Sequence, residues 1–277
     1  MERIQAAIQK AKEQRGEAGT VPAPGRLAAG AVRPAVRPSV AASAQLWAEL
    51  APYRPDPASM ERNRIVTFAD SDPAHVPFDM LRTKVLRTLQ ANGWTSVGIT
   101  SPTAACGKTT VSVNLAFSLA HQADLRTVLV DLDLRRPGVA RELELPGKHS
   151  VGRFLQGEAT IPETFLRYGD NLAIAANSEP TRHSGDLLMS AAAAQAVAGL
   201  KAGLAPNVLI YDLPPMLMSD DAMAFLPQLD AVLLVAGAER SRLDEVDNCE
   251  QELAEKTNLL GVVLNMCRYM GEDYGYY

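Results

Sequence analysis

The sequence predicts an α/β fold with a mostly parallel central sheet that is flanked by helices on both faces. Apolar runs alternate with helical stretches from about residue 61 onward, and the runs are continuous rather than alternating, which indicates strands buried on both faces. The expected strands cover residues 96–101, 127–131, 172–175, 207–212, 231–236 and 259–265. The expected helices between them lie near residues 75–91, 108–122, 185–202, 219–227 and 241–256, and this alternation favours parallel pairing.

The composition excludes several classes of protein. The 277 residues suffice for one large α/β domain plus extensions, and the formal net charge of −5 argues against a general affinity for nucleic acid. The three cysteines show no CxxC spacing, which favours a reducing compartment over a disulfide framework or a zinc site. No run approaches the roughly 18 apolar residues of a membrane helix, and the first residues carry no apolar secretory segment. We therefore expect a cytoplasmic protein that reaches the inner face of the membrane through a partner.

The chain divides into four expected parts. Residues 1–15 read as an amphipathic helix, either a surface helix or a docking helix for another protein, with its small apolar residues on one stripe. Residues 16–60 are rich in Ala, Pro and Gly, which is typical of a flexible linker. The strand and helix pattern occupies residues 61–266, and residues 267–277 form a tyrosine-rich tail.

The first strand of the pattern runs into a loop with the character of a phosphate site. Gly107 allows backbone amides to approach phosphate oxygens, Lys108 reaches the β and γ phosphates, and Thr109 can hold Mg²⁺ at a helix N-terminus. Pro102 stands where such loops usually begin with glycine, and an ordinary strand–turn–helix that happens to contain Gly-Lys-Thr is the alternative. The expected nucleotide-binding residues of this loop are Ala104, Ala105, Cys106, Gly107, Lys108, Thr109 and Thr110.

Carboxylates follow two further strands. Asp131 and Asp133 lie two residues apart after one strand, so they face the same side, and Asp212 ends another. Pairing with nearby arginines is the alternative reading for the first two. Ligands of parallel sheets bind at the carboxyl ends of strands, where an aspartate in the position of Asp212 holds Mg²⁺ or its water. Together with the loop, these strand ends predict a P-loop NTPase.

Four of the seven tyrosines lie in the last nine residues: Tyr269, Tyr274, Tyr276 and Tyr277. Alone, such a tail is more often a sticky or disordered end. A phenol, with a pKa of about 10, is a poor nucleophile at neutral pH unless a base and a polarised phosphoryl group lie beside it. After a nucleotide site, the tail therefore reads as the phosphoacceptor.

The ordered set of motifs resembles the bacterial tyrosine kinases, the cytoplasmic P-loop autokinases of capsule and exopolysaccharide biosynthesis and export. The resemblance covers roughly residues 75–277, and its motifs fall at residues 101–110, 128–135, 209–215, 221–222, 261–265 and 269–277. It implies an enzyme that uses ATP and Mg²⁺ to phosphorylate protein tyrosines and regulates polysaccharide polymerisation or export.

The resemblance also implies residue roles. Catalysis would rest on Lys108, Asp131, Asp133 and Asp212. Of these, Asp131 would accept the phenol proton, and Mg²⁺ would be held through Thr109, Asp133 and Asp212. Asn265 and Arg268 would lie near the adenine.

Further expectations concern partners. A tail that starts beside its own site would enter a neighbouring subunit's site, which implies a homo-oligomer with phosphorylation in trans. The family's E-x-x-R-x-x-R oligomerisation stretch is altered, since Arg82 is retained but Val76 and Asp79 occupy the other places. The alternative alignment, which begins at Asp79 and keeps Arg82, lacks the last arginine, at Val85. The resemblance implies a membrane-embedded polysaccharide co-polymerase adaptor, whose cytoplasmic end we expect to activate the kinase, and a cognate tyrosine phosphatase.

Two other functions fit the same site. One is a positioning or partition ATPase, although such proteins carry a signature lysine where this chain has Thr103. The other is a non-catalytic ATP-binding switch that holds an export complex together, which the glycine-poor loop and the altered oligomerisation stretch keep open.

Overall fold

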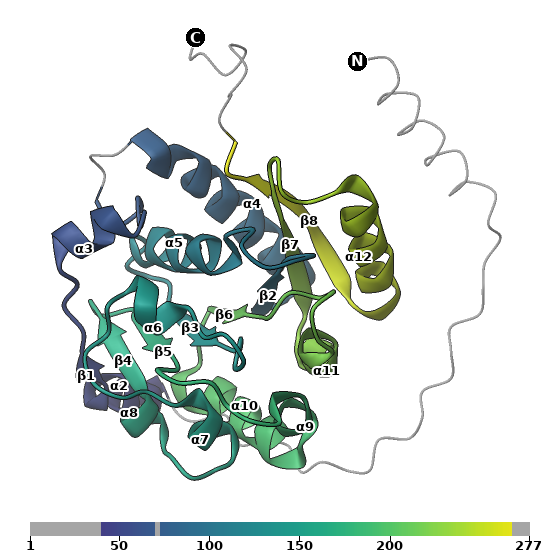
Figure 1. Ribbon diagram of the computed structural model, residues 1–277. Coiled ribbons are helices and arrows are strands. Elements are labelled where there is room, and N and C mark those ends of the chain that lie inside the picture. Colours follow the sequence, from purple (N-terminus) through teal and green to yellow (C-terminus); the bar gives the residue numbers. More distant parts are fainter. Residues whose placement is uncertain (1–39, 70–72, 268–277) are drawn as a thin grey trace. The chain divides into compact units, whose positions relative to one another are not determined.

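An eight-stranded sheet forms the centre of the structure, a computed structural model that describes residues 40–69 and 73–267 (Figure 1). Its strand order is β1-β4-β5-β3-β6-β2-β7-β8, and only β4 and β5 pair antiparallel. The strands are β1 (Ala51–Pro52), β2 (Ser96–Thr100), β3 (Thr127–Asp131), β4 (Phe165–Tyr168), β5 (Leu172–Ala175), β6 (Val208–Asp212), β7 (Ala231–Gly237) and β8 (Asn258–Asn265). The predicted α/β class with a mostly parallel sheet is confirmed.

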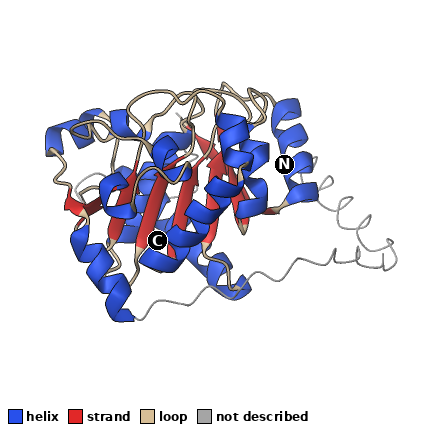
Figure 2. Ribbon diagram, turned by 90° about the horizontal axis from the view of Figure 1, so that it is seen from below, coloured by secondary structure: helices blue, strands red, loops and turns tan. Residues whose placement is uncertain are grey.

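Helices cover both faces of this sheet (Figure 2). They are α2 (Val40–Glu49), α3 (Pro57–Arg62), α4 (Val76–Asn92), α5 (Lys108–Ala120), α6 (Val139–Glu142), α7 (Val151–Leu155), α8 (Ile161–Thr164), α9 (Ser184–Met189), α10 (Ala191–Leu204), α11 (Asp221–Phe225) and α12 (Leu243–Lys256). Short 3₁₀ helices, η1 (Pro73–His75) and η2 (Leu226–Gln228), precede α4 and follow α11.

Alternate residues of each strand feed two separate cores. Val128 and Val130 of β3 pack in one core with residues of α7, α9, α10, α11 and α12, whereas Leu129 packs in the other with residues of α3, α4, α5 and α6. Because successive strand side chains point to opposite faces, an unbroken apolar run supplies both cores at once. This is why the predicted strands read as continuous runs.

The sequence pattern missed strands β1 and β4. Only Phe165 of β4 is fully buried, and Arg167 and Tyr168 dilute its apolar character. β4 turns back onto β5 through Gly169, whose φ of 57° is readily adopted by glycine, which makes this pair the antiparallel one. β1 is two residues long and pairs with β4.

Two predicted helices are interrupted. The stretch expected at 185–202 divides into α9 and α10 at Ser190, which has an extended ψ of 151° and accepts a hydrogen bond from Ala193 N at 3.1 Å. Serine caps helices in this way, so it begins α10 rather than continuing α9. The stretch expected at 219–227 is α11 followed by η2, and it begins at Asp221.

The expected flexible linker is wrong for residues 40–60. Helix α2 packs against α10, where Trp47 Nε1 donates to the Leu204 carbonyl at 2.8 Å and Ser43 Oγ donates to the same oxygen. Trp47, Leu50 and Met60 are buried core residues, and they supply the apolar surface that a linker lacks. The expected helix at 1–15, the linker residues 16–39 and the tail residues 268–277 lie outside the described residues.

None of the helices that the structure describes has the length and apolar character required to cross a membrane. The parallel strands place their carboxyl ends along one edge of the sheet. In this order β2 and β6 are neighbours and β3 lies beside β6. The loops that follow Thr100, Asp131 and Asp212 therefore meet at that edge, as expected for a ligand site of a parallel sheet.

Candidate active site

The loop after β2 closes tightly around Gly107, which has a φ of 82° and begins helix α5. Asn265, at the end of β8, donates a hydrogen bond from Nδ2 to the Cys106 carbonyl at 3.0 Å. A Cβ atom on Gly107 would lie 2.2 Å from that same Asn265 Nδ2. Both the left-handed backbone and the close approach therefore require glycine here.

The start of the loop is held by the segment that follows β6. Met216 N donates to the Ser101 carbonyl at 2.9 Å and Leu217 N donates to the Pro102 carbonyl at 3.1 Å. Ser101 Oγ donates to Thr103 O at 2.8 Å, which closes the turn without the usual first glycine. Ala104 and Ala105 form the exposed part of the loop, and Ala105 has a φ of 62°.

Lys108 lies between two of the predicted carboxylates. Its Nζ is 2.9 Å from Asp133 Oδ2 and 3.4 Å from Asp212 Oδ2, and the residue is 8% exposed. Burial lowers the pKa of the lysine, but Asp212 and Asp133 more than offset this effect and raise the pKa to about 12. The ammonium is therefore charged throughout the physiological pH range.

Asp212 is fully buried and bonds to two hydroxyls of α5. Thr109 Oγ1 donates to Asp212 Oδ2 at 2.7 Å, and Ser112 Oγ donates to Oδ1 at 3.1 Å. Burial raises the pKa of Asp212, while Lys108 and the hydroxyls oppose the rise. Sequence reasoning missed Ser112, although its position four residues after Lys108 places it on the same face of α5.

Asp131 is fully buried and orders the turn that follows β3. Its Oδ2 accepts the N–H groups of Gly138 and Val139, each at 3.1 Å, and its Oδ1 accepts Asp133 N at 3.2 Å. Burial and the neighbouring charge of Asp212 raise the pKa of Asp131 well above its usual range. The carboxyl group is thus suited to holding a proton.

The structure therefore brings Lys108, Thr109, Asp133 and Asp212 into direct contact, with Asp131 beside them. Among the described residues, neither Asp131 nor Asp133 forms an ion pair with an arginine, which was the alternative reading of this motif. Arg135 instead forms two hydrogen bonds of 2.9 Å to Asp221.

The donor set fits magnesium. Thr109, Asp133 and Asp212 offer only oxygen ligands, which Mg²⁺ prefers, and Mg²⁺ bound with a nucleotide uses one or two carboxylates together with water and phosphate oxygens. Among the described residues there is no group of three or more His, Cys, Asp or Glu side chains arranged to hold a metal ion by themselves. The residues fit a metal that arrives with phosphate rather than one held by a protein cage.

Two more side chains adjoin the loop. Glu142 of α6, which sequence reasoning missed, accepts a hydrogen bond from Thr110 Oγ1 at 3.2 Å, and burial together with nearby Asp212 raises the pKa of Glu142 to about 7. Cys106 is fully buried. Burial raises the pKa of its thiol, but hydrogen bonds with Ser241 and Thr103 outweigh burial and lower it overall.

Asn265 contacts the loop itself, through the Cys106 carbonyl, and its expected place beside the adenine stays a prediction. Arg268 and the four tail tyrosines lie outside the described residues, so their expected roles stay predictions as well.

Comparison with known proteins identifies the relatives of this site. A family model described as the CobQ/CobB/MinD/ParA nucleotide binding domain matches residues 97–272. Tyrosine-protein kinase YwqD of Bacillus subtilis (strain 168) is 26% identical over 220 residues, which cover 79% of this chain and 92% of YwqD. Succinoglycan biosynthesis transport protein ExoP of Rhizobium meliloti (strain 1021) is 32% identical over 165 residues, which cover 57% of this chain and 20% of ExoP.

Among solved structures, the kinase domain of Escherichia coli tyrosine kinase ETK superimposes with a TM-score of 0.64 at 25% identity, covering 74% of this chain and 82% of that one. The chain thus spans nearly all of YwqD but only a fifth of ExoP. The family match includes every member of the Lys108, Thr109, Asp131, Asp133 and Asp212 cluster. The chain belongs to the CobQ/CobB/MinD/ParA nucleotide-binding family, in which its relatives are bacterial tyrosine kinases of capsule and exopolysaccharide systems, as the resemblance in its motifs predicted.

Proposed function

We propose that the protein is an ATP-dependent protein tyrosine kinase that phosphorylates the tyrosine cluster at residues 269–277 of another copy of itself. The observation that carries the proposal is the position of the Lys108 ammonium between the carboxylates of Asp133 and Asp212. The Thr109 hydroxyl donates a hydrogen bond to the Asp212 carboxylate. A lysine, a hydroxyl and strand-end aspartates are the groups that phosphoryl transfer from a nucleotide requires.

The site residues have distinct parts in the transfer. The phenol oxygen forms a bond to the γ-phosphorus, and the bond to the β–γ bridging oxygen breaks with its electron pair leaving on ADP. Lys108 turns from the two carboxylates to the phosphate oxygens and balances their charge. Mg²⁺ bound through Thr109, Asp133 and Asp212 supplies further positive charge at the phosphates.

Asp131 takes the phenol proton in this proposal. Its raised pKa supports that role, because a carboxyl group that binds a proton more readily is a better general base near neutral pH. The side chain is fully buried, so the phenol reaches it only after the site opens as Lys108 moves to the nucleotide.

Transfer between copies requires an oligomer. In helix α4, Arg82 Nη1 donates to Asp79 Oδ1 at 2.8 Å and to the Ser118 carbonyl at 2.9 Å, so the two charged residues of the altered oligomerisation stretch have partners within their own chain. This arrangement supports a contact between copies that differs from an Arg82 ion pair. Relatives that include a transport protein support an export complex as the setting, with a membrane-embedded adaptor that holds a cytoplasmic kinase at the membrane and a phosphatase that reverses the modification.

A non-catalytic ATP-binding switch is the second candidate, and the burial of Asp131 favours it. Three backbone N–H groups bond to its carboxylate, which is the pattern of a residue that orders a turn. A switch would bind Mg-ATP through the same lysine and aspartates but would transfer no phosphate.

Phosphotyrosine detection separates these candidates. The full chain is purified from a host without tyrosine kinases, dephosphorylated and given Mg-ATP, alongside Lys108→Met, a variant with phenylalanine at the four tail tyrosines, and Lys256→Met as the matched control. Lys256 lies in an exposed ion pair with Glu252 of the same helix, so its loss leaves the site intact. We expect phosphotyrosine in wild type and Lys256→Met alone. Signal that persists in Lys108→Met would contradict the kinase proposal, and ATP binding without any signal would favour the switch.

A further inference from the structure

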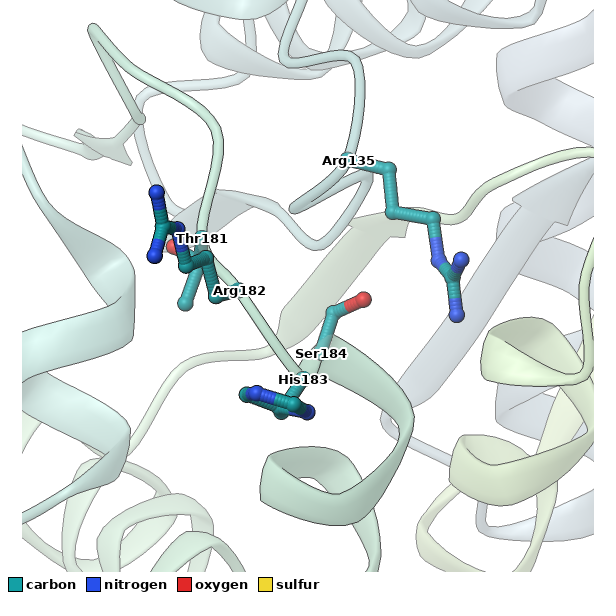
Figure 3. A pocket seen from close by; sticks show the side chains of 5 residues that line it. All are labelled: Arg135, Thr181, Arg182, His183 and Ser184. Atoms are coloured by element: carbon teal, nitrogen blue, oxygen red, sulfur yellow. The ribbon is translucent and has the colours of Figure 1, made fainter.

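A pocket of about 400 Å³ lies beside the proposed active site, and none of its lining residues belongs to the Lys108, Thr109, Asp131, Asp133 and Asp212 cluster (Figure 3). It is lined by Arg135, Thr181, Arg182, His183 and Ser184. Arg135 follows Asp133 by two residues, so the pocket opens at the edge of the sheet where Lys108, Asp133 and Asp212 also meet. Figure 3 shows Arg135 on one side of the pocket and the segment of the other four residues on the opposite side.

The pocket is fixed from beneath by one buried carboxylate. Asp221 is fully buried and accepts two hydrogen bonds of 2.9 Å from Arg135 and a third from the Ser184 hydroxyl. Thr181 N donates to the Leu134 carbonyl at 2.7 Å, which ties the opposite wall to the turn that follows β3. Both walls therefore keep their positions relative to Asp131 and Asp133.

The lining is cationic. Two arginines line the pocket, and no acidic residue is among the described residues that line it. Arg135 is half exposed although it is paired with Asp221 and also lies 3.8 Å from Asp220. Arg182 is exposed and forms no ion pair with any carboxylate in residues 40–69 or 73–267, so it is the free positive charge of the pocket. His183 has a φ of 52°, a backbone conformation that is uncommon for non-glycine residues and frequent at functional sites. This pocket is suited to an anionic ligand that approaches from outside.

We propose that this pocket docks the acidic pair Glu272-Asp273 of a second copy and thereby presents Tyr274 to the active site. The proposal rests on the proposed kinase function and adds its substrate preference. The two acidic residues directly precede Tyr274. Adjacent residues of an extended peptide direct their side chains to opposite sides, so the pair offers one carboxylate to each of two separated cationic groups.

The spacing of the pocket supports this assignment. Arg135 lies four residues after Asp131, so their backbones are at most about 14 Å apart. In an extended peptide, Glu272 lies about 7 Å before Tyr274. The long side chains of arginine, glutamate and tyrosine span the remainder, so one peptide can contact Arg135 and Asp131 together.

The test measures transfer between two full-length copies. The kinase copy has phenylalanine at its four tail tyrosines, and the substrate copy carries Lys108→Met with an intact tail. Kinase copies with Arg182→Gln are compared with Arg54→Gln, which removes the same charge from an exposed arginine beyond β1. Substrate copies with and without Glu272→Gln and Asp273→Asn complete a double-mutant cycle.

We expect Arg182→Gln to raise KM for the substrate copy roughly fivefold, as the loss of about 1 kcal/mol from an exposed charge pair predicts. The value of kcat and the KM for ATP should stay unchanged. The acid-to-amide substrate should show at least this rise with the wild-type kinase copy, because it also loses the contact with Arg135, and no further rise with Arg182→Gln. Arg54→Gln should behave as wild type.

Each failure has its own signature. The reference pair is the kinase copy without Arg182→Gln together with the substrate copy with Glu272 and Asp273 intact. If this pair yields no phosphotyrosine, the proposed kinase function itself is wrong. A reference pair that reacts while Arg182→Gln matches Arg54→Gln overturns the docking proposal alone. A rise in KM for ATP rather than for the substrate copy would assign the pocket to the nucleotide and also overturn the docking proposal.

Discussion

Gly107 and Asn265 are so close that one side chain limits the other. The left-handed backbone at Gly107 lets the Asn265 amide reach the Cys106 carbonyl, and this bond connects the end of β8 to the phosphate loop. The loop therefore takes its shape partly from a strand that lies two positions away in the sheet.

Gly107→Ala should weaken binding of Mg-ADP by roughly 1–3 kcal/mol, because the added methyl group meets Asn265 and the backbone remains left-handed. Asn265→Ala in the same chain should restore part of the loss by removing the collision. Titration calorimetry of the two single variants and the double variant measures both effects. Equal affinity in Gly107→Ala and wild type would contradict the geometry of the loop.

Glu142 makes the free energy of unfolding depend on pH. Its Oε2 has no hydrogen-bond partner among the described residues, and burial raises its pKa from 4.5 to about 7. Because the folded-state pKa is the higher one, its contribution to stability is complete below pH 4.5 and is lost as the pH rises through 7.

Glu142→Gln should therefore gain stability relative to wild type by roughly 3 kcal/mol between pH 5 and pH 8, at about 1.4 kcal/mol per pKa unit. Denaturant unfolding at both pH values measures the difference. Glu61→Gln, which changes an exposed glutamate of α3, is the control and should show no such trend. A difference between Glu142→Gln and wild type that does not change with pH would contradict the assignment.

At this scale the sequence predicted which side chains gather but not how they bond. Lys108, Asp133 and Asp212 could be expected together, because loops after parallel strands meet at one edge. Ser112 and Glu142 carry no motif of their own. They join the site only because α5 and α6 pack around it, and this packing depends on tertiary contacts that local patterns do not encode.

Among the elements, α2 was the least predictable. Its composition resembles the Ala- and Pro-rich segment before it, and its contribution to the fold comes from a few apolar side chains that a composition average hides. Trp47 donates to Leu204 and lies beneath Arg126, whose guanidinium carbon is 5.4 Å from the ring centroid. The strands, by contrast, were predictable because each run is apolar on both faces.

Trp47→Ala should destabilise the protein by roughly 3–5 kcal/mol, as large-to-small changes of buried aromatic residues do. Its folded fraction should bind Mg-ADP with unchanged affinity, because α2 packs on α10 and not on the phosphate loop. Gln45→Ala, on the exposed side of the same helix, should alter stability by no more than about 0.5 kcal/mol. Thermal unfolding of both variants and wild type measures these differences. If Trp47→Ala is as stable as wild type, residues 40–60 contribute little to the fold and act as a linker.

In the whole molecule, the sheet order separates the end of β8 from the proposed base, Asp131. β8 and β3 are four strand positions apart, which is about 19 Å at the usual spacing between strands. Tyr269 follows Cys267 by two residues, a reach of about 7 Å. This backbone reach is less than half of the distance between the two strands, which favours transfer to another copy.

We predict that Tyr269 is modified only by a neighbouring copy. A few active copies with Tyr269 as their only tail tyrosine are mixed with a large excess of Lys108→Met copies that carry phenylalanine at all four tail positions. Phosphate on Tyr269 should fall toward zero, because each active copy is surrounded by inactive neighbours. Mass spectrometry of the tail measures it. An amount that does not change on dilution would show transfer within one chain.

The central claim is that one site binds ATP and passes its γ-phosphoryl group to a tyrosine. Its most direct test compares ADP released with phosphotyrosine formed, after dephosphorylated wild-type protein is given Mg-ATP. We predict one phosphotyrosine in residues 269–277 for each ADP, and neither product from Lys108→Met or Asp212→Asn. ADP released without phosphotyrosine, or phosphotyrosine formed by Lys108→Met, would contradict the claim.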